Sequence, residues 1–272
     1  MSEAQLSLVG GLSLLVGLFG LVGCEDPPAP KQVAPVPASA PVALPVPVPA
    51  TAPPPAAVAE KIEKAAEKLV DCPKPPKVAF NDAALEVEVR RKASKPEGEL
   101  TAADLKKVRS VDLTRGGKSV DYLDPCAFPQ LTQLRHLYLA GGELSDLTPI
   151  ASLSFLEGLR ASANKVSALA PLKGMRAMDR LDLGRTQVRD LTPLKGMTKL
   201  TELQLDDTPV DDISPLASLS SLERLSIKRT RVSDLTPLKG LRKLKFLYVG
   251  GSPAADNVTA VQRAGLKISG ED

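Results

Sequence analysis

The feature that most constrains this chain is a period of 22 residues that runs without a slip through its second half. The period is marked by Leu131, Leu153, Met175, Met197, Leu219 and Leu241. With each of these taken as position 1, the first five repeats carry apolar residues at positions 1, 4, 7, 9, 14, 17 and 20 without exception, although only 43% of the chain is hydrophobic. An irregular repeat precedes them, beginning at Leu105 with four extra residues before Leu131. Such a period predicts a solenoid, in which short similar units stack and bury their apolar residues against their neighbours.

The spacing within the repeat assigns a structure to each part. Positions 7 and 9 lie two residues apart and point to the same side of a strand, so stacked repeats form a parallel sheet with these side chains inside. Positions 18 and 19 are a small residue followed by Pro, as in Thr192-Pro193, which predicts a Thr or Ser cap with Pro opening a helical turn. About five residues remain before the next repeat, which suits a 3-10 or one-turn helix. Position 12 carries a short residue that can bond backbone groups where the chain turns: Gly142, Asn164, Thr186, Thr208, Thr230 and Ser252.

This pattern resembles the leucine-rich repeat, and the run Asp234-Leu235-Thr236-Pro237-Leu238 closely resembles the short internalin type. The resemblance covers roughly 78–268. It implies an α/β leucine-rich repeat solenoid with a parallel β-sheet on its concave face, 3-10 or one-turn helices on its convex face and a helical N-terminal cap. Thr replaces the family's usual Asn at position 12 in three repeats, which shortens the reach of that side chain.

We expect an N-terminal cap over 78–104, about seven repeats over 105–252 and a C-terminal cap over 253–272. In the first cap, Asn81 precedes a helix that runs through Arg91, and a second short helix begins in Leu100–Asp104. In the last cap, we expect Asp256 to cap a helix and Leu266–Ile268 to form a final strand. Caps are needed because terminal repeats would otherwise expose the core.

Residues 1–23 read as an export signal, because the run Leu6–Val22 is uncharged, broken by glycines and short for a membrane span. It ends in Leu21-Val22-Gly23-Cys24, which resembles a bacterial lipoprotein signal and implies cleavage before Cys24 and lipidation of that residue. The alternatives are an uncleaved N-terminal anchor and a chance Cys. The basic residues of such signals are absent from Met1–Glu3, and a misassigned start codon would explain this. The resemblance implies a lipid-anchored protein of the cell envelope, in the periplasm, at the outer membrane or on the surface.

Residues 24–59 read as a disordered tether, because twelve prolines lie between Pro27 and Pro55 among Ala and Val. Such a chain favours polyproline II and would reach roughly 90 Å when extended. Its expected role is to hold the folded part away from a membrane, and the alternative is a docking site for a Pro-binding module. Residues 60–77 are expected to be a connector with a short amphipathic helix.

Cys72 and Cys126 remain once Cys24 is assigned to lipid. Cys72 lies just before the N-terminal cap and Cys126 lies in the irregular first repeat. An exported protein meets oxidising surroundings, so we expect a disulfide that ties the cap to the solenoid, with two free thiols as the alternative.

The sequence gives little support for an enzyme, a cofactor or a metal site. The chain has one His, which falls at position 6 of its repeat without an evident nucleophile beside it, so we interpret His136 as a contact residue. The pairs Asp206-Asp207 and Asp211-Asp212 could bind calcium. We prefer to read Asp212 as the recurrent Asp of the repeat, a turn cap, and expect no metal. The net charge of +3 with interleaved acids gives no support for nucleic-acid binding.

Binding is therefore the expected function, and the expected contacts are strand positions 6 and 8, whose side chains point away from the core. Tyr and Arg, the usual anchors of protein interfaces, are prominent among them. The alternative for Arg180, Glu202 and Arg224 is that they only pair with each other across strands. Two functions stay open: a monomeric, membrane-anchored module that binds a protein, and an envelope component that binds glycan or peptidoglycan. The expected contacts are His136, Tyr138, Arg160, Arg180, Asp182, Glu202, Gln204, Arg224, Phe246 and Tyr248.

Overall fold

The computed structural model describes residues 72, 78–115 and 119–270. The chain divides into two units, 1–59 and 60–272, and the described residues all belong to the second. The expected signal, the lipidated Cys24, the tether and the connector helix lie outside the described residues. In the described part of the chain, no helix has the length and apolar character needed to cross a membrane.

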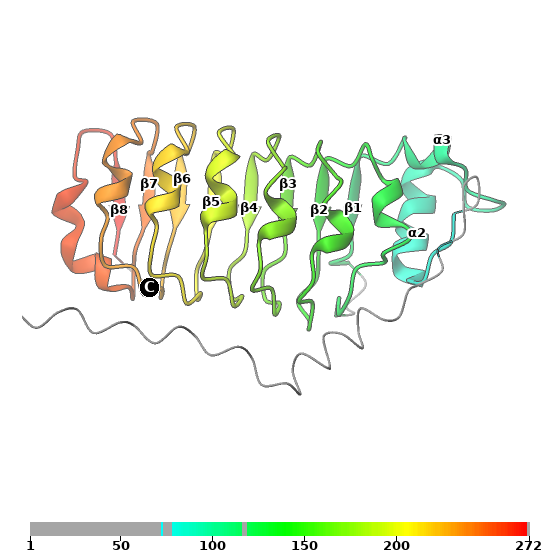
Figure 1. Ribbon diagram of the computed structural model, residues 1–272, viewed down its shortest axis with the longest axis horizontal. Helices are drawn as coiled ribbons and strands as arrows, with labels where there is room; N and C mark the ends of the chain where they lie inside the picture. Colours follow the sequence, from blue (N-terminus) through cyan, green and yellow to red (C-terminus); the bar gives the residue numbers. More distant parts are fainter. Residues whose placement is uncertain (1–71, 73–77, 116–118, 271–272) are drawn as a thin grey trace, which may run out of the picture. The chain divides into compact units, whose positions relative to one another are not determined.

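The described unit is built on one open sheet of eight parallel strands in sequential order (Figure 1). Each strand is three residues long, because the chain must turn back within a 22-residue unit. The repeat period also sets the register, so that position 7 of each repeat pairs with position 7 of the next, as in Leu159 with Leu181. The strands are β1 (Ser110–Asp112), β2 (His136–Tyr138), β3 (Gly158–Arg160), β4 (Arg180–Asp182), β5 (Glu202–Gln204), β6 (Arg224–Ser226), β7 (Phe246–Tyr248) and β8 (Lys267–Ser269).

A single apolar core fills the space behind the sheet. In the five regular repeats, every residue at positions 1, 4, 7, 9, 14, 17 and 20 is at most 2% exposed. Burial of each Leu, Ile, Val or Met side chain among them contributes on the order of 1.5–3 kcal/mol. The leucine-rich repeat solenoid expected from the sequence is thereby confirmed, with the sheet on the concave face.

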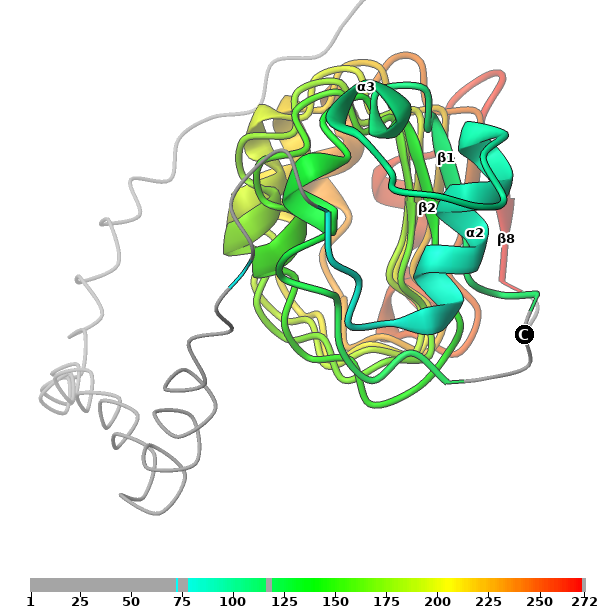
Figure 2. The same ribbon diagram turned by 90° about the vertical axis from the view of Figure 1, so that its right-hand side faces the viewer.

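Short 3-10 segments cover the convex side, opposite the sheet (Figure 2). The segments are η1 (Phe128–Gln130), η2 (Thr148–Ile150), η3 (Ala170–Leu172), η4 (Thr192–Gly196), η5 (Ser214–Ser218), η6 (Thr236–Gly240) and η7 (Pro253–Ala260). The prediction that Thr or Ser caps them is wrong. In four of the segments, η2, η4, η5 and η6, the cap is instead the Asp two residues earlier, whose carboxylate accepts the backbone N–H at position 18, as in Asp190 with Thr192 at 2.8 Å.

Where position 12 is not glycine, its side chain donates a hydrogen bond to the backbone of the turn after the strand. The hydroxyls of Thr186, Thr208 and Thr230 donate to the carbonyl three residues earlier at 2.6–2.8 Å. Asn164 reaches further, since its amide also donates to the carbonyl of Ala140 in the preceding repeat at 3.1 Å. Thr thus keeps the bond within its own repeat and loses the bond between repeats.

The residue before this position adopts a left-handed conformation in successive repeats. The φ angle is between 51° and 57° at Ala163, Arg185, Asp207 and Arg229. This geometry lets the backbone N–H reach the next repeat, as in Arg185 N to Asp206 O at 2.7 Å. A non-glycine residue is strained there, so the inter-repeat bond holds the turn in this shape.

The N-terminal cap is helical, as expected. Helix α2 (Ala83–Ala93) begins after Asp82, whose carboxylate accepts the N–H groups of Ala84 and Leu85, and it runs two residues beyond the expected end at Arg91. Helix α3 (Ala102–Leu105) follows, with a reciprocal capping box between Thr101 and Asp104. Helix α2 packs against β1 and covers that edge of the sheet.

The C-terminal cap differs from the expectation at two points. Asp256 lies inside η7 and does not cap a helix, because the 3-10 turn already begins at Pro253, after Ser252. The final strand forms as β8, one residue later than expected, after a turn at Gly265 with φ of 84°.

Candidate functional site

The concave face is formed by the side chains at positions 6 and 8 of each strand. The parallel register aligns them in two rows that cross the sheet. The position 6 row is His136, Gly158, Arg180, Glu202, Arg224 and Phe246, and the position 8 row is Tyr138, Arg160, Asp182, Gln204, Ser226 and Tyr248. All ten residues expected as contacts therefore lie on this face. Their role in binding stays a prediction.

A hollow of about 300 Å³ lies over β2 to β5 in this face. Gly158, the position 6 residue that has no side chain, is one of the residues that line it. A Cβ atom there would lie 2.9 Å from Nδ1 of His136, so a side chain at this position would have to displace the imidazole, which leans over β3. The ring of Tyr138 lies nearly parallel to that imidazole, with centroids 6.3 Å apart. The hollow thus has two rings on one side and charged side chains on the other.

Charged side chains across the hollow lie at ion-pair distances. Glu202 lies between two guanidinium groups, 3.9 Å from Arg180 and 3.7 Å from Arg224. Asp182 accepts a hydrogen bond from the Ser162 hydroxyl at 3.0 Å and lies 3.5 Å from Arg160. The local pairing considered as the alternative for these residues therefore exists, but the side chain of Arg180 stays 69% exposed and can still meet a partner. Exposed pairs of this kind contribute about 0–1 kcal/mol, so they leave these side chains free to re-pair.

Two lining residues at position 5, just before the strands, were missed by the sequence reasoning. Glu157 accepts a hydrogen bond from Arg135 and lies 4.0 Å from Nε2 of His136. Asp179 accepts a hydrogen bond from the Thr201 hydroxyl at 2.6 Å. A signal was present in the sequence, because position 5 is polar in every repeat from Arg135 onward, but the strand alternation directs attention to positions 6 and 8 alone.

A cluster of a different kind lies at the other end of the face, over β6 to β8. The Arg224 guanidinium lies 5.2 Å from the centre of the Phe246 ring, and Nζ of Lys267 lies 5.8 Å from it. Both distances fall in the range of cation–π contacts. Lys267 was not among the expected contacts, because nothing in the repeat pattern shows that β8 continues the sheet in register.

The acidic residues considered for calcium are bonded to protein groups. The carboxylate of Asp207 accepts two hydrogen bonds from Arg229, which holds the pKa of that carboxyl below its usual range. Asp212 accepts bonds from the backbone N–H and the hydroxyl of Ser214, which also lower the pKa of its carboxyl. Asp211 pairs with Arg189 at 2.9 Å. Among the residues that the structure describes, no three His, Cys, Asp or Glu side chains are placed to hold a metal ion.

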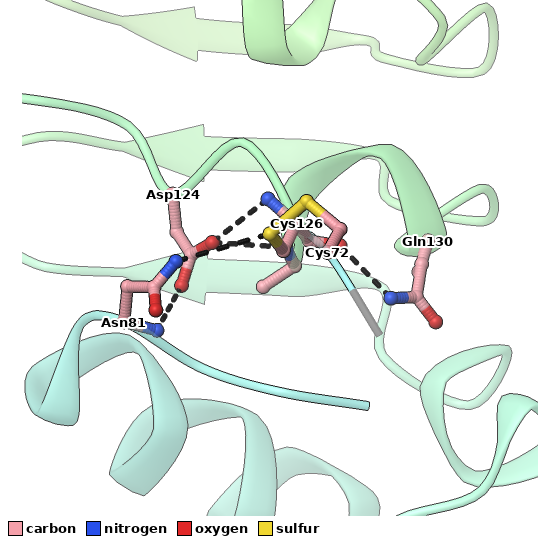
Figure 3. The surroundings of a disulfide bond; sticks show 6 residues. Cys72, Asn81, Asp124, Cys126 and Gln130 are labelled. Carbon is pink, nitrogen blue, oxygen red and sulfur yellow. Dashed lines mark hydrogen bonds between the residues drawn. A yellow bond between two sulfur atoms is a disulfide. The ribbon is translucent and has the colours of Figure 1, made fainter. Parts of the chain in front are cut away.

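The two remaining cysteines are joined in the structure, with a Cα–Cα distance of 5.3 Å between Cys72 and Cys126 (Figure 3). The bond is surrounded by hydrogen bonds to a buried carboxylate. Asp124, which is fully buried, accepts the backbone N–H groups of Asn81 at 2.5 Å, Cys126 at 2.9 Å and Ala127 at 3.1 Å. This carboxylate therefore connects the start of the N-terminal cap, at Asn81, with the turn before η1. The sequence analysis identified the two cysteines as a candidate disulfide but did not single out Asp124.

No family model and no curated protein matches this chain. Among solved structures, internalin C2 from Listeria monocytogenes is similar, with 31% identity and a TM-score of 0.63 over 73% of this chain and 87% of that one. An internalin, inlF, from the same organism has 24% identity and a TM-score of 0.53 over 70% of this chain and 64% of that one. A leucine-rich repeat protein from Leptospira interrogans has 16% identity and a TM-score of 0.51 over 61% of this chain and 50% of that one. The last two similarities concern the fold alone.

Proposed function

Because the chain belongs to the internalin-type leucine-rich repeat proteins, we propose that it is an exported, lipid-anchored module that binds a protein partner through the concave face of its repeats. The observation that carries the proposal is the gathering of aromatic and Arg side chains on this face. Three of the protein's eight Phe and Tyr residues, Tyr138, Phe246 and Tyr248, lie there at strand positions 6 and 8. Aromatic and Arg side chains are the usual anchors of protein interfaces.

The length of the face suits a macromolecular partner. Neighbouring strands lie about 4.8 Å apart, so the eight strands of the sheet span roughly 34 Å. The position 7 residues between the rows and the position 9 residues beside them are buried in the core, so the rows are held on a rigid sheet. A rigid surface loses little conformational entropy on binding, which favours affinity.

The proposed anchor rests on the sequence Leu21-Val22-Gly23-Cys24 and on the Pro-rich segment after it. The position of Cys72 is consistent with an anchor that leaves the concave face open to a partner. Cys72, where the described part of the chain begins, is bonded to Cys126, which lies two residues before η1 in the convex layer. At Cys72 the chain is therefore fastened to the segment that leads into the convex layer.

The binding proposal is tested with the full-length chain and two matched variants. Tyr138→Ala with Tyr248→Ala removes two aromatic contacts from the concave face, whereas Lys173→Ala with Lys239→Ala changes the convex side. Each protein is presented both to cell-envelope proteins and to purified sacculi. We expect the concave variant to weaken capture of a protein by about 30-fold, corresponding to ~2 kcal/mol for two anchors, and the convex variant to bind as the original does.

Three results would count against the proposal. Loss of binding in the convex variant alone would show that the wrong face was chosen. Capture of sacculi and of no protein would favour the envelope glycan function. For the anchor, mass spectrometry of the membrane fraction should find a lipid-modified peptide that begins at Cys24, and a dominant intact peptide beginning at Met1 would refute it.

A further inference from the structure

Three side chains form a continuous row across the last three strands. The register aligns Arg224 on β6 with Phe246 on β7, and Phe246 with Lys267 on β8. The two cations therefore approach the same ring from the strands on its two sides, at 5.2 Å and 5.8 Å from its centre. Tyr248 lies on the same strand and the same face as Phe246, two residues further along.

This end of the face carries unbalanced positive charge. Lys245 is neutralised by Glu223, because their charged atoms lie 2.8 Å apart. Arg224 shares the single carboxylate of Glu202 with Arg180, at 3.7 Å and 3.9 Å. Of the residues in the described ranges, none has a carboxylate within 4.0 Å of the Lys267 ammonium group. Arg224 and Lys267 thus retain capacity for an anion.

The hydrogen-bonding groups of Arg224 are also incompletely used. Its Nε is buried without a hydrogen-bond partner among the described residues, and its closest carboxylate oxygen lies at 3.7 Å, beyond hydrogen-bond distance. A guanidinium carries its N–H donors in its own plane, so a contact with an aromatic ring does not consume them. The Arg224 side chain remains 42% exposed beside the Phe246 ring, so its terminal N–H groups, rather than the buried Nε, are the donors that can meet a bidentate acceptor.

From these observations we infer that the β6–β8 end of the concave face binds an acidic segment of a protein partner. Arg224 and Lys267 receive a carboxylate of that segment, and Phe246 with Tyr248 receives an apolar side chain beside it. This inference rests on the proposed function and deepens it, because it assigns the partner's chemistry and the part of the face that reads it.

The local charge favours a peptide carboxylate over a densely charged polyanion. Glu202 and Glu223 lie in the same part of the sheet as the two cations. A chain with a sulfate on every sugar would bring anions against both of these carboxylates, whereas one carboxylate with an apolar neighbour would meet only Arg224, Lys267 and the rings. Like-charge contacts of this kind disfavour the wrong partner.

The test is a titration of the full-length chain, observed through its backbone amide chemical shifts. The probe is a blocked five-residue peptide with a leucine followed by two glutamates, and its matched control has glutamines in place of the glutamates. A sulfated disaccharide is the second anion. We expect the glutamate peptide to shift the amides of β6 to β8 and to bind about fivefold more tightly than its glutamine analogue, since an exposed charge-assisted hydrogen bond gives a modest gain.

Variants locate the effect. Arg224→Gln with Lys267→Gln should abolish the preference for glutamate over glutamine, while the convex pair Lys173→Gln with Lys239→Gln should keep it. The spectrum of each variant also reports whether the solenoid remains folded, so a lost preference is not confused with unfolding.

Equal binding of the two peptides, shifts centred on β2 to β5, or tighter binding of the sulfated disaccharide would each overturn the inference. The result is separable from the test of the proposed function. If the Tyr138 and Tyr248 variant loses a captured protein but the glutamate peptide shows no preference, only the acidic-segment inference fails. If the peptide binds at β6 to β8 and no protein depends on the concave face, the proposed function fails and the carboxylate site stands.

Discussion

Replacing both Cys72 and Cys126 with Ala should destabilise the N-terminal end of the solenoid by roughly 4 kcal/mol. The bond joins residues separated by 54 positions in the sequence. For a loop of that length, the entropy that a cross-link removes from the unfolded chain is about 14 cal/mol/K, which is ~4 kcal/mol at 25 °C. The substitutions remove little else, since Ala keeps the small apolar character of the buried Cys126 site.

The loss of stability should be confined to the N-terminal end of the solenoid. Each repeat contacts its neighbours, and the cap packs on β1 and the irregular first repeat, so the loss does not spread evenly along the solenoid. The amides to follow are those of Asn81, Cys126 and Ala127, which bond the buried carboxylate of Asp124 beside the disulfide (Figure 3). When the bridge is lost, opening of this turn should become about 1,000-fold more frequent, the factor that corresponds to ~4 kcal/mol.

Amide hydrogen exchange, read by mass spectrometry on the full-length chain, measures this change directly. Oxidised protein, reduced protein and the double alanine variant are compared. We expect the last two to exchange alike and rapidly around the Asp124 turn, while amides of β4 to β7 stay as protected as in the oxidised protein. Adding reductant to the alanine variant should change nothing, which controls for other effects of the reagent.

The loop-closure reasoning is refuted if the reduced protein keeps full protection around Asp124, because the bridge would then add no stability to this end. The bond itself is checked by thiol titration of the unfolded, unreduced protein from its native envelope. Neither Cys72 nor Cys126 should react, and two reactive thiols would exclude the bridge.

Two further predictions concern single carboxylates. Ala168 occupies the place of the capping Asp in the repeat where η3 begins, and Leu169 has nearly the same backbone angles there as Leu191 in the capped repeat. Ala168→Asp should therefore raise the free energy of unfolding by about 0.5 kcal/mol, and with it the melting temperature, because the new carboxylate would cap η3 as the equivalent Asp residues cap the neighbouring segments. An unchanged or lower melting temperature would show that the N–H is not available. In the cap, hydrogen bonds from Thr101, Lys95 and Lys107 hold the pKa of Asp104 well below its usual range. Because the folded pKa is lower than the unfolded one, the stabilisation is present above about pH 4 and is lost as the pH falls below it. Asp104→Asn should be less stable at pH 7 and lose less between pH 5 and pH 2, and parallel losses in the two proteins would contradict the assignment.

The sequence by itself determined the fold of the described unit. The seven apolar positions of the repeat can all be buried at once only if successive units stack in register, so the period implies the parallel sheet, the core and the identity of the outward-facing residues. The ends were less certain, because the caps occur once each and have no repetition to reveal them. Asp256 was misassigned there for that reason.

Capping also shows the limit of local reasoning. Thr and Asp are both good caps, and both precede Pro in the run Asp190–Pro193. The structure selects Asp, because Leu191 adopts the conformation that aims the Thr192 N–H at the Asp190 carboxylate. The left-handed residues before position 12 are similar, since Ala163, Arg185 and Arg229 carry no sequence signal for that geometry and adopt it to bond the next repeat.

Only the tertiary structure decided how the outward residues work together. The sequence places Arg224 and Phe246 on one face but does not bring Lys267 beside them, since β8 lies outside the regular period and its register follows from backbone pairing with β7. It also does not show that Gly158 opens a hollow under His136, or that Asp124 gathers three N–H groups beside the disulfide. A repeating pattern fixes which side chains point outward, whereas distances between them depend on how strands, turns and caps pack in three dimensions.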